Sequence, residues 1–150
     1  MALTDGFAVR ILALDIGEKR CGLAVSDSTG KIALPLRTLH TRDVFENSAA
    51  FQRVLADYEP DLLLCGLPVS LSGHENQQAI RIREQAESVA GQIHLPLEFM
   101  DERLSSANAR RILRESGYSE RAMREKVDAV AASLILQSYL DVSQNAIIGS

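Results

Sequence analysis

Three acidic side chains stand where the sequence predicts buried structure. Asp15 lies at the end of the apolar run 11–16, and Asp128 lies on the inward face of a C-terminal helix. Glu102 follows a second apolar run, 95–100. A buried carboxylate is costly to desolvate unless a cation of the protein or a metal ion accompanies it. Because Mg²⁺ and Mn²⁺ prefer oxygen ligands, the pattern predicts a site for one of these ions.

The three acids together suit metal-assisted hydrolysis of a phosphodiester. Two such ions about 4 Å apart could activate a water molecule and stabilise the departing oxygen of an in-line displacement. Asp15 and Asp128 are predicted to bind metal, and Glu102 to bind metal or to position the attacking water. Asp101, directly before Glu102, is an alternative metal ligand.

Each acid also has a purely structural interpretation. Asp15 could form an ion pair with Lys19 or Arg20 across the turn that follows it. Asp128 could be held by basic residues near the start of its own helix, where negative charge is favoured in any case. The metal site is favoured because acids from three separate elements converge at one predicted edge of the sheet.

Basic residues are concentrated around the same predicted edge. Mixed charge of this kind is most often a solvated helical face. Beside a metal site it could also bind a phosphate backbone, because arginine contacts phosphate oxygens through two parallel hydrogen bonds. The residues predicted to bind nucleic acid are Lys19, Arg20, Arg103, Arg110 and Arg111.

The N-terminal part of the chain predicts an antiparallel meander of three strands. Their predicted bounds are 9–16, 21–27 and 31–39. Residues 28–30 form a hairpin signal, and Pro35 favours an edge position for the third strand because proline cannot donate to a ladder.

Helices then alternate with two further strands. The predicted elements are a helix 43–58, a strand 62–65, a helix 72–91, a strand 95–100, and helices 104–116 and 119–140. Asp43 with Glu46 and Ser72 with Glu75 resemble capping boxes, and Gly91 is expected to end the second of these predicted helices.

This order of elements predicts an α/β fold built on one five-stranded mixed sheet. Strands separated by helices need right-handed crossovers, so the first, fourth and fifth strands are expected to be parallel. Ligands of open α/β sheets bind beyond the carboxyl ends of such strands, where the strand order reverses. Asp15 and the turn 101–103 would both lie there.

Composition sets further bounds on the class of protein. The 150 residues fit one domain over 1–150, with a loose tail expected at 145–150. No apolar run is long enough to span a bilayer and the start lacks a signal-peptide pattern, so a cytoplasmic protein without a membrane partner is expected. A formal net charge of −4 argues against coating nucleic acid by charge alone. Cys21 and Cys65 lie in predicted buried strands and are expected to be reduced thiols.

Four blocks of the sequence resemble a known family. LALDIGEKRCGLAVSD, LLCGLPVSLSGHENQQA, FMDERLSSANARRIL and KVDAVAASLILQSYL are similar, in this order, to the signature blocks of the YqgF family, also called RuvX. The resemblance implies a ribonuclease H-like fold and a nuclease that matures the 5′ end of precursor 16S ribosomal RNA. An older assignment for the family is Holliday-junction resolvase.

The resemblance also assigns positions. It places the family's strand-one aspartate at Asp15, the acid of its DER block at Glu102 and its last-helix aspartate at Asp128. Lys19, Arg20 and Arg103 fall on basic positions of the family. Related resolvases carry an acid after their fourth strand, where this chain has Gly66-Leu67-Pro68, so the second acidic ligand stays open between Glu102 and Asp101.

Three functional hypotheses follow. The preferred one is an Mg²⁺- or Mn²⁺-dependent phosphodiesterase acting on structured RNA, with the ribosomal small subunit as a further partner. The second is the same chemistry on branched DNA, which generally requires a two-fold dimer; the sequence leaves monomer and homodimer open. The third is a catalytically silent module that binds nucleic acid or the ribosome.

Overall fold

Five strands form one mixed sheet in the computed structural model, which describes residues 8–68, 76–102, 111, 114–115, 117 and 119–149. The strands are β1 (Ile11–Ile16), β2 (Arg20–Ser26), β3 (Ala33–His40), β4 (Leu62–Leu67) and β5 (Leu97–Asp101). Their order across the sheet is β3-β2-β1-β4-β5. Neighbours are antiparallel from β1 to β3 and parallel from β1 through β4 to β5. The predicted mixed sheet, with its third strand at an edge, is therefore confirmed.

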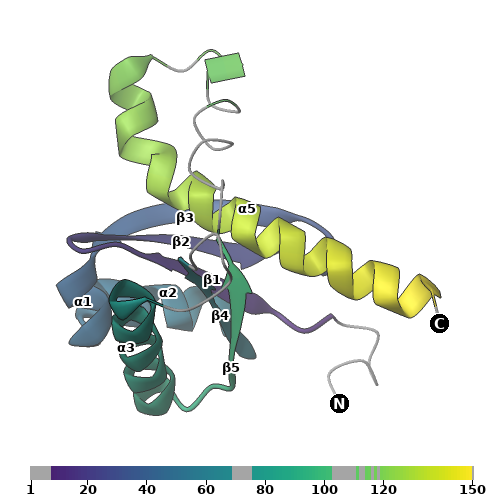
Figure 1. The fold of residues 1–150 in the computed structure, drawn as a ribbon, viewed down its shortest axis with the longest axis horizontal. Helices are drawn as coiled ribbons and strands as arrows, with labels where there is room; N and C mark the ends of the chain where they lie inside the picture. Colours follow the sequence, from purple (N-terminus) through teal and green to yellow (C-terminus); the bar gives the residue numbers. More distant parts are fainter. Residues whose placement is uncertain are drawn as a thin grey trace.

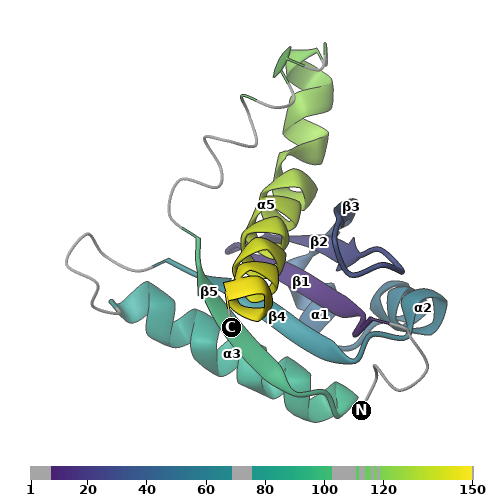
Figure 2. The same cartoon turned by 90° about the vertical axis from the view of Figure 1, so that its right-hand side faces the viewer.

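Helices cover both faces of this sheet (Figure 1). Those on one face are α1 (Thr41–Phe45), α2 (Ala49–Tyr58) and α3 (Gln77–Ile93), whereas α5 (Glu120–Gly149) crosses the other face (Figure 2). Within the described part of the chain, no helix combines the length and apolarity needed to cross a membrane.

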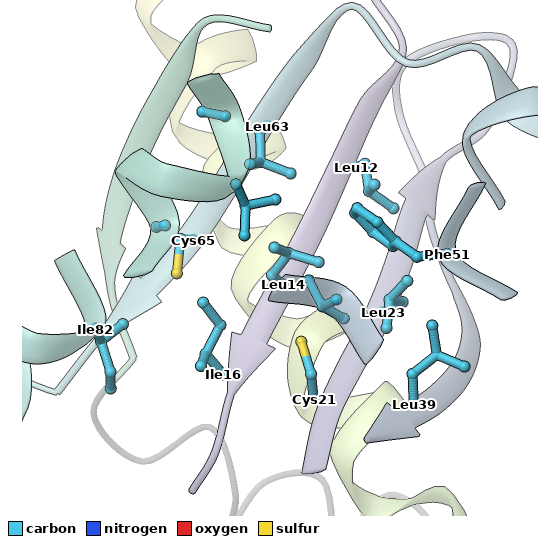
Figure 3. Close-up of a cluster of buried hydrophobic side chains, with 14 of the residues drawn as sticks. Leu12, Leu14, Ile16, Cys21, Leu23, Leu39, Phe51, Leu63, Cys65 and Ile82 are labelled. Carbon is cyan, nitrogen blue, oxygen red and sulfur yellow. The ribbon is translucent and has the colours of Figure 1, made fainter. Parts of the chain in front are cut away.

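Alternation along the strands divides the core into two layers. On β1, Leu12 and Leu14 point toward α2 and α3, where they pack with Phe51 (Figure 3). Ile11 and Ala13 point the other way, toward α5. Because successive side chains of a strand alternate between faces, Asp15 belongs to the α5 face. The fold therefore places this carboxylate between the sheet and the last helix.

The two cysteines belong to the layer beneath α2 and α3. Cys21 on β2 and Cys65 on β4 are both fully buried and form no disulfide, as expected (Figure 3). Burial raises the pKa of both thiols, Cys65 to well above its ordinary range. These cysteines are therefore core residues and poor nucleophiles.

The predicted helix 43–58 is wrong, because two helices occupy this stretch. Asn47 has a φ of 50°, in the left-handed region, which interrupts the helical path between α1 and α2. The side chain of Ser48 then caps α2 by accepting a hydrogen bond from the backbone N–H of Phe51. A local cap therefore overrode the apparent capping box of Asp43 and Glu46.

The other helices differ from prediction mainly at their ends. α3 begins at Gln77 with Asn76 as its cap, and it continues past Gly91 to Ile93. The predicted start at Ser72 lies outside the described residues, as does most of the predicted helix 104–116. α5 continues to Gly149, so residues 145–149 are helical where a loose tail was expected.

Gly22 allows α5 to rest directly on β2. A Cβ atom at this position would lie 1.9 Å from the carbonyl oxygen of Asp128 and 2.8 Å from the amide nitrogen of Ala129. Both of these are backbone atoms, which cannot rotate away. The absent side chain of Gly22 therefore sets how closely Asp128 approaches the sheet.

We expect Gly22→Ala to lower the free energy of unfolding by about 1–3 kcal/mol, because the added methyl group must push α5 off β2. Gly91→Ala is the matched control. A Cβ at this helical glycine meets nothing within 4 Å, so the change should be neutral or stabilising by about 0.5–1 kcal/mol. Urea unfolding of both variants measures the difference. Equal stability of the two would mean that α5 does not rest on β2 at Gly22.

Candidate active site

Asp15 lies between two glycines at the carboxyl end of β1. It pairs with Gly22 of β2 on one side. On the other side Leu14 pairs with Cys65, which brings Gly66 of β4 level with Asp15. A Cβ at Gly66 would lie 2.6 Å from Oε2 of Glu102. The two glycines thus leave space beside Asp15, one for the backbone of α5 and one for the side chain of Glu102.

Glu102 reaches Asp15 from the end of β5. Its backbone N–H donates to the carbonyl of Leu67 at 3.1 Å, which extends the β4–β5 ladder by one step. Met100 packs in the layer beneath α5, and Glu102, two residues on, faces the same way. The Glu102 carboxyl donates a side-chain hydrogen bond to Asp15. These two acids therefore form a carboxyl–carboxylate pair.

Asp101 does not share this position. It is exposed, and alternation along β5 places it on the same face as Phe99, which packs in the opposite layer. Its negative charge still contributes to raising the pKa of Glu102. Of the two acids that the sequence left open, the structure brings Glu102 beside Asp15.

Asp128 completes the group from α5. Its neighbours Ala131, Ala132 and Ile135 are buried, which confirms that this face of the helix looks inward. The Oδ2 atom lies 3.2 Å from Nε of Arg20, is inaccessible to solvent and accepts no hydrogen bond of good geometry. The ion pair suggested by the sequence thus exists, but it joins Arg20 to Asp128 and not to Asp15.

Burial and like charge shift the proton affinity of this group. Burial raises the pKa of Asp15, the charge of Asp128 raises it further, and the hydrogen bond from Glu102 opposes both. Burial, followed by the charge and the hydrogen bond of Asp15, raises the pKa of Glu102 from an ordinary value of 4.5 to about 8. Near neutral pH the pair therefore holds one proton on Glu102, donated toward Asp15.

The donor chemistry of the group fits a divalent cation, although its present arrangement is not that of a metal site. Across the described ranges, no three His, Cys, Asp or Glu side chains are arranged to hold a metal ion. In this arrangement Glu102 is paired with Asp15, and Asp128 is paired with Arg20. Burial and, after it, the charge of Asp128 raise the pKa of Asp15, and a bound cation would relieve this repulsion.

A cleft of about 750 Å³ opens beside Asp128. Lys19 and Arg20, both predicted to bind nucleic acid, line it. His40 and Arg42 line it too, and sequence reasoning missed both. The only signal for His40 is its pairing with Arg20 across β2 and β3, which requires the register of the sheet.

The remaining predicted basic residues are not placed at this cleft. Arg103 and Arg110 lie outside the described residues. Arg111 is exposed and forms an ion pair with Glu115 at 3.4 Å, four residues further along the chain. A second cavity, of about 620 Å³, lies at the opposite end of β1, between Ile11 and Leu140, away from the three acids.

Comparison with solved structures defines the class of fold. The crystal structure of the fowlpox virus resolvase with Holliday junction DNA covers 90% of this chain and 99% of its own, with a TM-score of 0.54 at 15% identity. Thermus thermophilus RuvC in complex with a Holliday junction covers 91% of this chain and 96% of its own, with a TM-score of 0.53 at 14% identity. The chain therefore has the ribonuclease H-like fold of these resolvases.

Sequence comparison then identifies the family. The model of RuvX, described as Holliday junction resolvase, matches residues 9–142. Relatives from Chloroflexus aggregans and Moorella thermoacetica, each 38% identical, are both named "Putative pre-16S rRNA nuclease". The first alignment covers 90% of this chain and 95% of the relative, and the second covers 93% and 100%. The chain belongs to the RuvX family.

The shared proton makes stability depend on pH. Between pH 4.5 and about 8 the folded chain holds a proton on Glu102 that the unfolded chain has released, so the free energy of unfolding falls as pH rises. In buffer with a chelator, the urea midpoint should therefore be lower at pH 8 than at pH 5, and Glu102→Gln should flatten this slope.

The exposed Glu46 provides the matched control, since Glu46→Gln removes a carboxylate of the same type outside the group. That variant should keep the slope of the native chain. If Glu102→Gln also kept it, the proton would not be held on Glu102.

Proposed function

We propose that this chain is a divalent-metal-dependent nuclease that hydrolyses phosphodiester bonds in structured RNA and matures the 5′ end of precursor 16S ribosomal RNA. Family membership and the names of the relatives support this activity and substrate. The observation that carries the proposal is the meeting of Asp15, Glu102 and Asp128, from three separate elements, beside a cleft lined by Lys19 and Arg20.

The proposed ligands of Mg²⁺ or Mn²⁺ are Asp15, Asp128 and Glu102. These ions prefer carboxylate oxygens, and the solvent-inaccessible Oδ2 of Asp128 accepts no well-formed hydrogen bond that would compete. When bound, the ion would activate a water molecule and stabilise the departing oxygen. Under this proposal the nuclease acts in the cytoplasm, and the small ribosomal subunit that contains the RNA is a further partner.

The chain's own residues prepare the site. Glu102 must give up its proton before its carboxylate can act as a ligand or as the acceptor that orients a water molecule, and because burial and the charge of Asp15 raise its pKa, this proton competes with the metal and binding should strengthen as pH rises. Arg20 pairs with the carboxylate of Asp128 at 3.2 Å and so places a cation beside a proposed metal ligand. Lys19, exposed on the rim of the cleft, would hold the phosphate backbone.

A second candidate is resolution of Holliday junctions. It is favoured by the description of the family model and by the two resolvases of the same fold, both of which were solved with junction DNA. Symmetric cleavage of a four-way junction requires two sites related by a two-fold axis. This candidate therefore requires a homodimer, whereas cleavage of RNA does not.

We expect Asp15→Asn to reduce cleavage of a precursor 16S RNA fragment to less than about a hundredth of the native rate in Mg²⁺ or Mn²⁺, because the metal supplies several kcal/mol of stabilisation. Glu102→Gln should also lose activity. Asp101→Asn is the matched control and should retain most of it, since Asp101 faces the opposite layer. A native rate for Asp15→Asn, with normal thermal unfolding, would rule out this mechanism.

Substrate choice is tested by giving the native chain the precursor RNA and a four-way DNA junction at matched salt, because phosphate contacts make both affinities salt-dependent. The proposal predicts faster cleavage of the RNA. Paired nicks in the junction with intact RNA would favour the resolvase. Tight binding of RNA without turnover in any divalent metal would favour a silent binding module.

A further inference from the structure

The cleft beside Asp128 has a second wall that the proposed function does not use. His40 is the last residue of β3, and Arg42 lies in the first turn of α1. Both are exposed, and both line the same cleft as Lys19 and Arg20. The cleft is therefore cationic on both the β2 side and the β3–α1 side.

Thr41 fixes the two walls relative to each other. Its backbone N–H donates to the carbonyl of Lys19 at 2.9 Å, and its hydroxyl donates to the carbonyl of Gly17 at 2.8 Å. The side chain is buried, so these bonds are shielded from water. Because His40 and Arg42 flank Thr41, both are held in place against the turn 17–20.

Two of the three lysine and arginine side chains that line this cleft have no ion-pair partner among the described residues. Within the part of the chain that the structure describes, neither Lys19 nor Arg42 has a carboxylate within ion-pair distance. Arg20 is paired with Asp128, and Glu18 is the other acid on the rim. Unpaired cations held side by side around a cavity favour an anionic ligand.

The size and position of the cleft indicate which anion. Its volume of about 750 Å³ lies in the range of small-molecule sites and admits a phosphate together with its sugar. Asp128, a proposed metal ligand, lines the cleft, so an occupant would lie close to the reacting phosphate. The ligand expected in the cleft is therefore a neighbouring phosphate of the same RNA strand.

We propose that Arg42 and His40 form a second phosphate-binding subsite, which holds the RNA backbone next to the cleaved bond. The inference rests on the proposed function for the identity of the strand. Arg42 would contact two phosphate oxygens through its guanidinium, and His40 would donate one hydrogen bond. Such contacts fix the path of the strand and do not read its bases.

The test is binding of a fluorescein-labelled RNA hairpin, in EDTA so that metal-dependent cleavage does not interfere, at a series of KCl concentrations. Arg42→Gln should weaken binding about equally for hairpins of different sequence. It should also reduce the slope of log K against log salt by about 1, the signature of one lost phosphate contact. His40→Gln with Arg42→Gln should weaken binding further.

Two variants serve as controls. Arg53→Gln removes an exposed arginine of α2 that does not line the cleft, and it should leave affinity and slope unchanged. Arg42→Lys keeps the charge but not the two parallel hydrogen bonds, so it should restore the slope with weaker binding. Thermal unfolding of each variant confirms that the fold is intact.

The outcomes separate this inference from the proposed function. A native slope for Arg42→Gln overturns the subsite, while cleavage by the native chain would still support the nuclease. A reduced slope for Arg42→Gln, with no cleavage by the native chain in any divalent metal, supports the subsite and overturns the nuclease. If the native chain binds no RNA hairpin at all, the proposed subsite is overturned.

Discussion

The contact between the backbone of α5 and Gly22 is the constraint on which the site depends. It brings Asp128 within electrostatic reach of Asp15, whose partner across the ladder is Gly22 itself. On the other side of Asp15, the absent side chain of Gly66 leaves room for the side chain of Glu102. A larger residue at Gly22 would clash with the backbone of α5, and one at Gly66 would clash with the side chain of Glu102. Glycine weakens a strand interior, so these two positions lower the stability of their strands but allow α5 and the side chain of Glu102 to approach the sheet closely.

Crowded carboxylates oppose folding, and the chain supplies two neutralising devices. One is the proton shared between Glu102 and Asp15, and the other is the ion pair of Arg20 with Asp128. The ion pair lines the cationic cleft, and both devices are reversible, since the proton can leave and the arginine is largely exposed. Because the proton and the arginine can both be replaced, these two contacts are compatible with the cation binding proposed above.

Much of this arrangement follows from local patterns, and the rest does not. The apolar run of β1, broken only by Asp15, and the alternation of strands with helices predicted the sheet and the meeting of the three acids. The break between α1 and α2 was missed because it depends on the left-handed backbone of Asn47, which competes with an equally plausible capping box. The partner of Arg20 was missed because it lies 108 positions away, at Asp128, and only the packing of α5 selects it. The positions of His40 and Arg42 on the cleft were missed for the same reason, because they depend on the register of β2 with β3.

The position of the second acid shows how one strand can substitute for another. The family resemblance implies that related resolvases carry an acid after the fourth strand, where this chain has Gly66-Leu67-Pro68. Here the side chain of Glu102 lies against Gly66, so near that a Cβ there would be 3.1 Å from the Cβ of Glu102. An acid arriving from β5 thus occupies the space over β4, and it can do so only because β4 contributes no side chain at that point. Alternation along β5 selects Glu102 over Asp101 for this task, since only one of two adjacent strand residues can face Asp15. The glycine at position 66 of β4 and the acid at position 102 after β5 therefore depend on each other.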